Sequence, residues 1–170
     1  MFRSIGALAL IVAAAALASP VRADDAQVER GKYLVTIGDC IDCHTQGYFF
    51  AKPDMTRYLG GSDVGFQVGD LGVFVGPNLT PDKETGLGDW TAQQIETVLT
   101  TGVRPDGRIL APIMPWRALA KMTKPDLLAL IAYLKSLPPI TNKVPGPFGP
   151  DEKPSVPVMK IVMPEGAPPK

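Results

Sequence analysis

The sequence has 170 residues, with 17 basic and 17 acidic side chains, so its formal net charge at neutral pH is zero. It shows no basic stripe, which argues against a nucleic-acid-binding protein. The length suits one domain, and 18 prolines with 17 glycines indicate long ordered loops.

The first 23 residues have the layout of a secretory signal peptide. A short positive start at residues 1–3 precedes an apolar run at residues 5–17 and then Val21-Arg22-Ala23, where a signal peptidase could cleave. A retained membrane anchor is the alternative, but the run is shorter than the about 20 residues that a span needs. We therefore expect a periplasmic protein that has no membrane span after cleavage.

A first helix is predicted at residues 24–38, where Gly38 would end it. Gly31 has no side chain and could let another helix cross closely. Helical spacing predicts a buried face with Val28 and Tyr33 beside it, formed by Ala26, Arg30, Leu34 and Ile37.

Residues 46–77 are rich in glycine and have no helical periodicity. We expect a loop with one short hairpin, residues 66–68 against 73–75, that turns at Gly69-Asp70. Residues 77–89 continue as loop.

Two later helices have clear ends. One covers residues 91–101, between the capping residue Thr91 and Gly102, and a loop at residues 102–116 follows it. The other covers residues 123–137 and is capped by Thr123. Their buried stripes are Ile95, Val98 and Leu99 in the first, and Leu127, Leu130, Ile131 and Leu134 in the second.

Ten of the 33 residues from 138 to 170 are prolines, which exclude a helix or a central strand. This tail either lies extended over the domain or is partly disordered. The predicted fold is therefore mainly α, with a helical domain at residues 24–139 and a Pro-rich extended tail at residues 140–170.

The chemistry is concentrated in the run Cys-Ile-Asp-Cys-His at residues 40–44, which is the pattern of covalent haem attachment. Cys40 and Cys43 can each bond one porphyrin vinyl group, and His44 can ligate the iron. The run and the lack of an internal repeat predict one haem c.

Three other interpretations compete for this run. A thioredoxin-like pair would follow a strand, whereas a helix precedes the cysteines here. A structural zinc site needs about four ligands, but the chain has only two cysteines and one histidine. A plain disulfide leaves His44 without a role.

Because His44 is the only histidine, a second axial ligand from this chain would be a methionine thioether. Met114 is favoured, since Pro112 and Pro115 stiffen the backbone around it. The other candidates, each of which could instead fill the core, are Met55, Met122, Met159 and Met163.

The sequence resembles class I c-type cytochromes over residues 27–139. The likeness rests on a helix before the haem motif and on the runs Gly-Pro-Asn-Leu-Thr-Pro-Asp (76–82), Gly-Asp-Trp-Thr (88–91), Arg-Pro-Asp-Gly-Arg (104–108), Met-Pro-Trp (114–116) and Leu-Ile-Ala-Tyr-Leu-Lys-Ser-Leu-Pro-Pro (130–139). It looks like the cytochrome subunits that serve periplasmic dehydrogenases of alcohols, aldehydes and related substrates. Those tend to carry several such domains, and this chain has one.

The resemblance implies roles for particular residues. Pro77 matches the position whose carbonyl accepts the N–H of the haem-ligating histidine, and Met114 matches the distal ligand. Trp90 and Arg108 fall where such proteins line the haem propionates, with Arg104 a weaker candidate. Core packing for Trp90 and a solvated loop for the arginines are the alternatives. The first and last helices are expected to cross near Gly31 and Tyr133.

The expected function is electron transfer without catalysis, from a dehydrogenase to a downstream cytochrome or oxidase. A haem enzyme or gas sensor with a labile sixth ligand is the alternative. A subunit whose haem only supports the fold is a third possibility.

Overall fold

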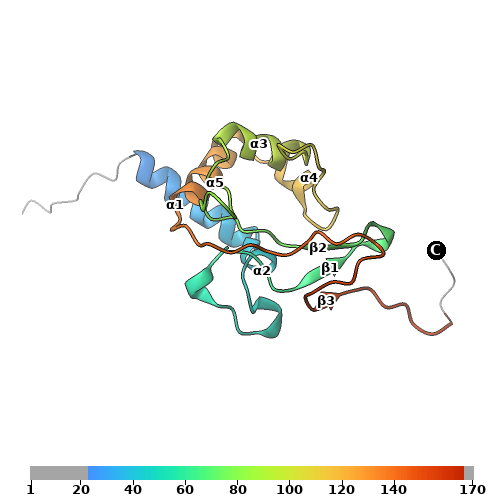
Figure 1. Ribbon diagram of the computed structural model, residues 1–170. Coiled ribbons are helices and arrows are strands. Elements are labelled where there is room, and N and C mark those ends of the chain that lie inside the picture. The colour runs from blue at the N-terminus through green and yellow to red at the C-terminus, as the bar shows by residue number, and fades with distance from the viewer. Residues whose placement is uncertain (1–22, 167–170) are drawn as a thin grey trace, which may run out of the picture.

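The computed structural model describes residues 23–166, which contain five α-helices and three short strands. The predicted signal peptide lies outside the described residues except for Ala23. The helices are α1 (Ala23–Ile37), α2 (Cys40–His44), α3 (Ala92–Thr101), α4 (Trp116–Leu119) and α5 (Lys124–Ser136). The strands are β1 (Gly65–Gln67), β2 (Val73–Val75) and β3 (Val158–Met159). The mainly α fold is thereby confirmed (Figure 1).

Helices α1 and α5 cross each other, and α3 packs against α5 on the side of the molecule away from the sheet (Figure 1). The crossing point is Gly31, where an added Cβ would lie 1.9 Å from the carbonyl oxygen of Ala129 and 2.7 Å from Cβ of Tyr133. The predicted crossing near Gly31 and Tyr133 is confirmed. The buried core lies where these helices meet: Val35, Ile95, Val98, Leu99, Leu127, Leu130, Ile131 and Leu134, with Leu59 from a loop.

The predicted buried face of α1 is wrong. Gly31 and Val35 are its buried residues, whereas Ala26 and Arg30 are exposed and Ile37 is 57% exposed. The physical reason is the crossing itself. Because Gly31 must face α5, the neighbouring buried position lies four residues along, and Ile37 points to the opposite side of the helix.

The helix ends follow the predicted capping. The hydroxyl of Thr91 accepts from the Gln94 amide while the Gln94 side chain accepts from the Thr91 amide, which is a capping box before α3. Gly102 ends α3 with φ of +76°. The Thr123 hydroxyl caps α5 by accepting a hydrogen bond from the Asp126 amide. Two short helices, α2 and α4, were not predicted because five and four residues show no periodicity.

The predicted hairpin is confirmed: β1 and β2 pair antiparallel, with Phe66 opposite Phe74, and a turn at Gly69–Leu71 joins them. The tail adds β3, which pairs parallel to β1 at the edge of the sheet. An edge position suits a Pro-rich segment because one side of the strand needs no partner. Between α5 and β3 the tail lies extended over the domain (Figure 1).

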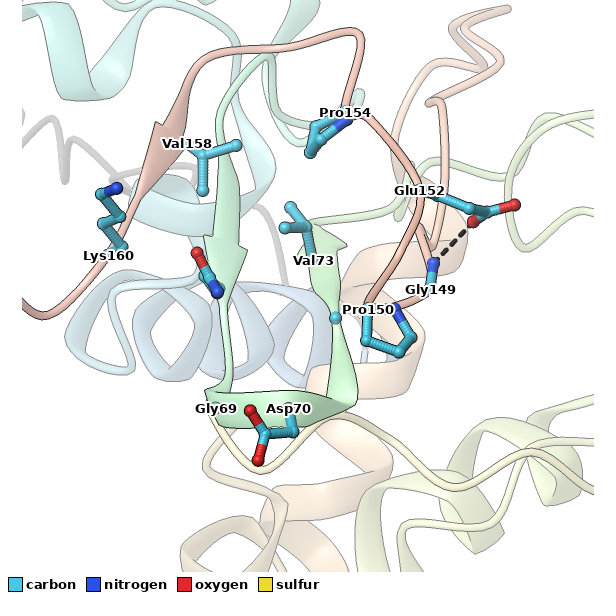
Figure 2. Close-up of a pocket in the computed structure, with 11 residues that line it drawn as sticks. Gly69, Asp70, Val73, Gly149, Pro150, Glu152, Pro154, Val158 and Lys160 are labelled. Atoms are coloured by element: carbon cyan, nitrogen blue, oxygen red, sulfur yellow. Dashed lines mark hydrogen bonds between the residues drawn. The ribbon is translucent and has the colours of Figure 1, made fainter. Parts of the chain in front are cut away.

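A shallow groove lies where the tail meets the sheet. Figure 2 shows Val73 of β2 and Val158 of β3 facing it, with Glu152 accepting a hydrogen bond from the Gly149 amide at its rim. No residue of the predicted haem site lines this groove. Among the described residues, no helix is both long and apolar enough to cross a membrane.

Candidate haem-binding site

The two cysteines lie one turn apart on α2. Asp39, with φ of +49°, turns the chain from α1 into this short helix. Residues three apart lie on the same helix face, so Cys40 and Cys43 present both sulfurs to one side. They are not bonded to each other. Burial raises the pKa of the Cys40 thiol to about 11 and also raises that of Cys43, so both are neutral at physiological pH.

His44 ends α2 and is only 5% exposed. Its Nδ1 lies 2.8 Å from the carbonyl oxygen of Pro77, which is the contact that the resemblance implied. Nδ1 therefore carries the proton and donates it, so the lone pair of Nε2 is left for a metal. Burial lowers the pKa of His44, which keeps the ring in the neutral form that a metal ligand requires.

Gly76 explains how Pro77 comes so close to α2. A Cβ at Gly76 would lie 1.6 Å from the carbonyl oxygen of Cys43 and 3.4 Å from Nδ1 of His44. Only glycine allows the two backbones to meet there. The carbonyl of Gly76 also accepts from the Ser62 amide at 2.9 Å. Gly76 was not predicted to be a site residue, although its place before Pro77 in the 76–82 run was a usable signal.

Met114 lies in a turn just before α4. Its amide donates to the Ala111 carbonyl, and its carbonyl accepts from the Trp116 amide at 2.8 Å. The ring of Trp116 packs over Gly102, where a Cβ would lie 2.6 Å from it. This contact anchors the Met114 turn to the end of α3. The packing of the Trp116 ring on Gly102 was not predicted from the sequence.

Trp90 is half-buried and packs against the core. The guanidinium carbon of Arg104 lies 5.1 Å from the centroid of its ring, a cation–π distance. Arg108 instead donates to Asp106 at 2.7 Å, and its side chain is 53% exposed. Arg104 is therefore the arginine that lies next to Trp90. The resemblance had made Arg104 the weaker candidate for the propionates and Arg108 the stronger one.

Several of these side chains converge on one apolar cluster. Cys40, Trp90 and Met114 all pack against the buried core formed by α1, α3 and α5. The donor set fits a haem c: two neutral thiols on one helix face, a neutral histidine with a free Nε2, and a half-buried thioether. When covalently bound to Cys40 and Cys43, the haem would supply reversible one-electron chemistry beside this cluster.

Comparison with known proteins agrees with a haem c site. A sequence model of the cytochrome c family matches residues 28–138. The chain belongs to the cytochrome c family. Membership of this family implies a covalently attached haem c and a role in electron transfer.

Three relatives of this cytochrome c illustrate where similar chains occur. It is 32% identical over 147 residues to the cytochrome c subunit of alcohol dehydrogenase (quinone) from Gluconacetobacter polyoxogenes, covering 86% of this chain and 28% of that subunit. It is 36% identical over 134 residues to the gluconate 2-dehydrogenase cytochrome c subunit from Pantoea cypripedii, covering 78% and 28%. It is 32% identical over 136 residues to the fructose dehydrogenase cytochrome subunit from Gluconobacter japonicus, covering 76% and 26%. The chain thus spans only 26 to 28% of the length of these relatives.

Proposed function

We propose that the chain is a periplasmic cytochrome with one haem c, held through Cys40 and Cys43 and ligated by His44 and Met114. The observation that carries the proposal is the 2.8 Å contact between His44 Nδ1 and the Pro77 carbonyl, which orients the ring and leaves Nε2 for iron. The single attachment run supports one haem.

The burial of the methionines supports Met114 as the sixth ligand. Met55, Met159 and Met163 are 46 to 56% exposed. Met114 and Met122 are the two that pack against the core. Met122 sits directly before the cap of α5, whereas Met114 lies in the stiff turn before α4. A neutral thioether in apolar surroundings favours the reduced state, which raises the potential.

Trp90 and an arginine of the 104–108 loop are proposed to line the haem propionates. The proximity of Arg104 to Trp90 supports Arg104 as the propionate-binding arginine. Arg108 instead donates a hydrogen bond to Asp106. A positive guanidinium suits a carboxylate ligand.

The names of the relatives suggest the partners. We propose that a periplasmic dehydrogenase supplies electrons and that a downstream cytochrome or oxidase receives them. Residues 1–23 would act as the signal peptide, residues 24–139 as the cytochrome domain and residues 140–170 as the tail. If His44 and Met114 both ligated the iron, no position would be left open for oxygen chemistry.

Spectroscopy of the purified holoprotein tests the ligation. We expect one haem per chain, a low-spin spectrum and a sulfur-to-iron band at the red end of the visible range. Met114→Ala should abolish that band and permit rapid carbon monoxide binding, whereas the matched variant Met122→Ala should keep it. Rapid carbon monoxide binding by the unaltered protein would favour the alternative, a haem enzyme or gas sensor with a labile sixth ligand.

A further inference from the structure

The segment Ile140–Val144 of the tail lies across the two loop segments that hold His44. Figure 1 shows the chain after α5 running back past α2 towards the sheet. One of the two loop segments is residues 59–61 and the other is residues 76–80. Each contacts His44 on one side and the tail on the other, and we call Ile140–Val144 the strap.

Residues 59–61 hold the backbone of His44. The Gly61 amide donates to the His44 carbonyl at 2.8 Å. The strap reaches the same residues, because Nδ2 of Asn142 donates to the Gly60 carbonyl at 2.7 Å. A Cβ at Gly61 would lie 2.3 Å from a methyl carbon of Val144, so the strap lies directly on this segment.

Residues 76–80 hold the ring of His44 through the Pro77 carbonyl. The next residue, Asn78, is only 2% exposed, and its Oδ1 accepts from both the amide and the hydroxyl of Thr80. Its Nδ2 donates to the Ile140 carbonyl at 2.6 Å, and the Ile140 amide donates back to the Thr80 hydroxyl at 3.0 Å. The strap is therefore hydrogen-bonded to a buried group next to Pro77.

Thr85 joins the two contacts. Its hydroxyl accepts from Nδ2 of Asn78 at 3.0 Å and from the Asn142 amide at 2.9 Å. Satisfied buried networks of this kind are rigid, because each lost bond would leave a buried polar group unpaired. The backbone of His44 is thus held by one loop and its ring by the other, and the strap is hydrogen-bonded to both loops.

We propose that Asn142 is a positioning residue for His44, acting with the backbone of the strap to set the strength of the hydrogen bond to Pro77. This inference rests on the proposed function, since it treats His44 as the iron ligand. A stronger hydrogen bond from Nδ1 makes the imidazole more basic, and a more basic ligand stabilises the oxidised iron. The strap therefore keeps the potential lower than the same ligands would have with a loosely held histidine.

The test compares Asn142→Ala with Lys143→Ala, a matched control at the exposed neighbouring position. Both holoproteins are measured by potentiometric titration and by amide hydrogen exchange. We expect Asn142→Ala to raise the reduction potential and to speed exchange at the Gly61 amide about tenfold, as loss of one hydrogen bond would. Lys143→Ala should change neither, and both variants should keep their haem and their low-spin spectrum.

A second variant covers the case in which Asn142→Ala does not fold. Thr85→Val keeps the shape of the side chain and removes the shared acceptor, so it should shift the potential in the same direction. The inference is overturned if loaded, low-spin variants have the potential of the unaltered protein. If the unaltered protein carries no covalent haem, the proposed function fails instead.

Discussion

Gly31 of α1 lies directly against the carbonyl oxygen of Ala129 in α5, so closely that a Cβ at Gly31 would sit 1.9 Å from that oxygen. This contact determines how closely α1 and α5 approach where they cross beside the buried core. Because the atom in the way is backbone, it cannot rotate aside as a flexible side chain could.

Gly31→Ala is expected to destabilise the protein by about 1–3 kcal/mol, the usual cost of forcing extra atoms into a packed core. The gain in helix propensity from alanine, at most about 1 kcal/mol, offsets only part of this. Chemical denaturation measures the change. Lys32→Ala, on the exposed side of the same helix, is the control and should change stability by less than about 0.5 kcal/mol. Equal stability of the two variants would contradict the close contact between Gly31 and Ala129.

Gly76→Ala should separate the Pro77 loop from α2, because the new Cβ would lie 1.6 Å from the Cys43 carbonyl oxygen. We expect lower yield of holoprotein and a raised potential in what does form, since the His44 hydrogen bond weakens. Haem content per chain and potentiometric titration measure the two effects. Gly149→Ala is a control for the loss of a glycine, since Gly149 has no positive φ and a Cβ there meets nothing closer than 3.6 Å. Normal loading with an unshifted potential in Gly76→Ala would count against the close approach.

Arg104→Gln should lower the reduction potential, because it removes a positive charge that disfavours the oxidised iron. The change in the free energy of reduction is expected to be on the order of 1 kcal/mol. Arg108→Gln should have a smaller effect, since Asp106 lies 2.7 Å from Arg108 but 3.4 Å from Arg104, and the side chain of Arg108 is 53% exposed against 24% for Arg104. Potentiometric titration of both variants decides between the two arginines. A larger shift for Arg108→Gln would reverse the assignment.

The carboxyl of Asp106 should titrate in the folded protein at a pKa of about 2, because the Arg108 hydrogen bond lowers it from 3.8, with Arg104 adding a smaller effect. A lowered pKa in the folded state stabilises it above about pH 4, and that contribution is lost as the pH falls towards 2. Both partners are about half exposed, so the contribution is below about 1 kcal/mol. Carbon NMR of Asp106 measures the titration midpoint, which Arg108→Gln should move upwards. An unmoved midpoint would show that Arg108 is not the cause.

Ending the chain after Pro139 should lower the free energy of unfolding by about 2–5 kcal/mol. This truncation removes five hydrogen bonds made by Ile140 and Asn142, each worth about 1 kcal/mol, and leaves the side chain of Asn78 partly unpaired. Ending it after Pro150 keeps those bonds and loses β3, so the effect should be smaller. Denaturant titration compares the two. Turnover with the proposed dehydrogenase partner should fall in both if the tail also contacts that partner.

Much of the fold was predictable because its signals are local. Thr91 and Thr123 mark helix starts by side chains that bond amides three residues later, and Gly102 marks an end. The face of α1 was not predictable in this way. Helical spacing permitted several faces, and only the contact with Ala129 of α5 selects the one that contains Gly31.

The sequence by itself determined the kind of cofactor, because Cys40, Cys43 and His44 stand within one turn of chain and need no partner to be recognised. Only the tertiary structure decided what surrounds His44: the approach of Gly76 to Cys43 and the tie between Asn78 and Ile140. Those contacts join residues that are 33 and 62 positions apart. Contacts over such separations leave no periodic pattern in a sequence, since they depend on how distant loops are packed together.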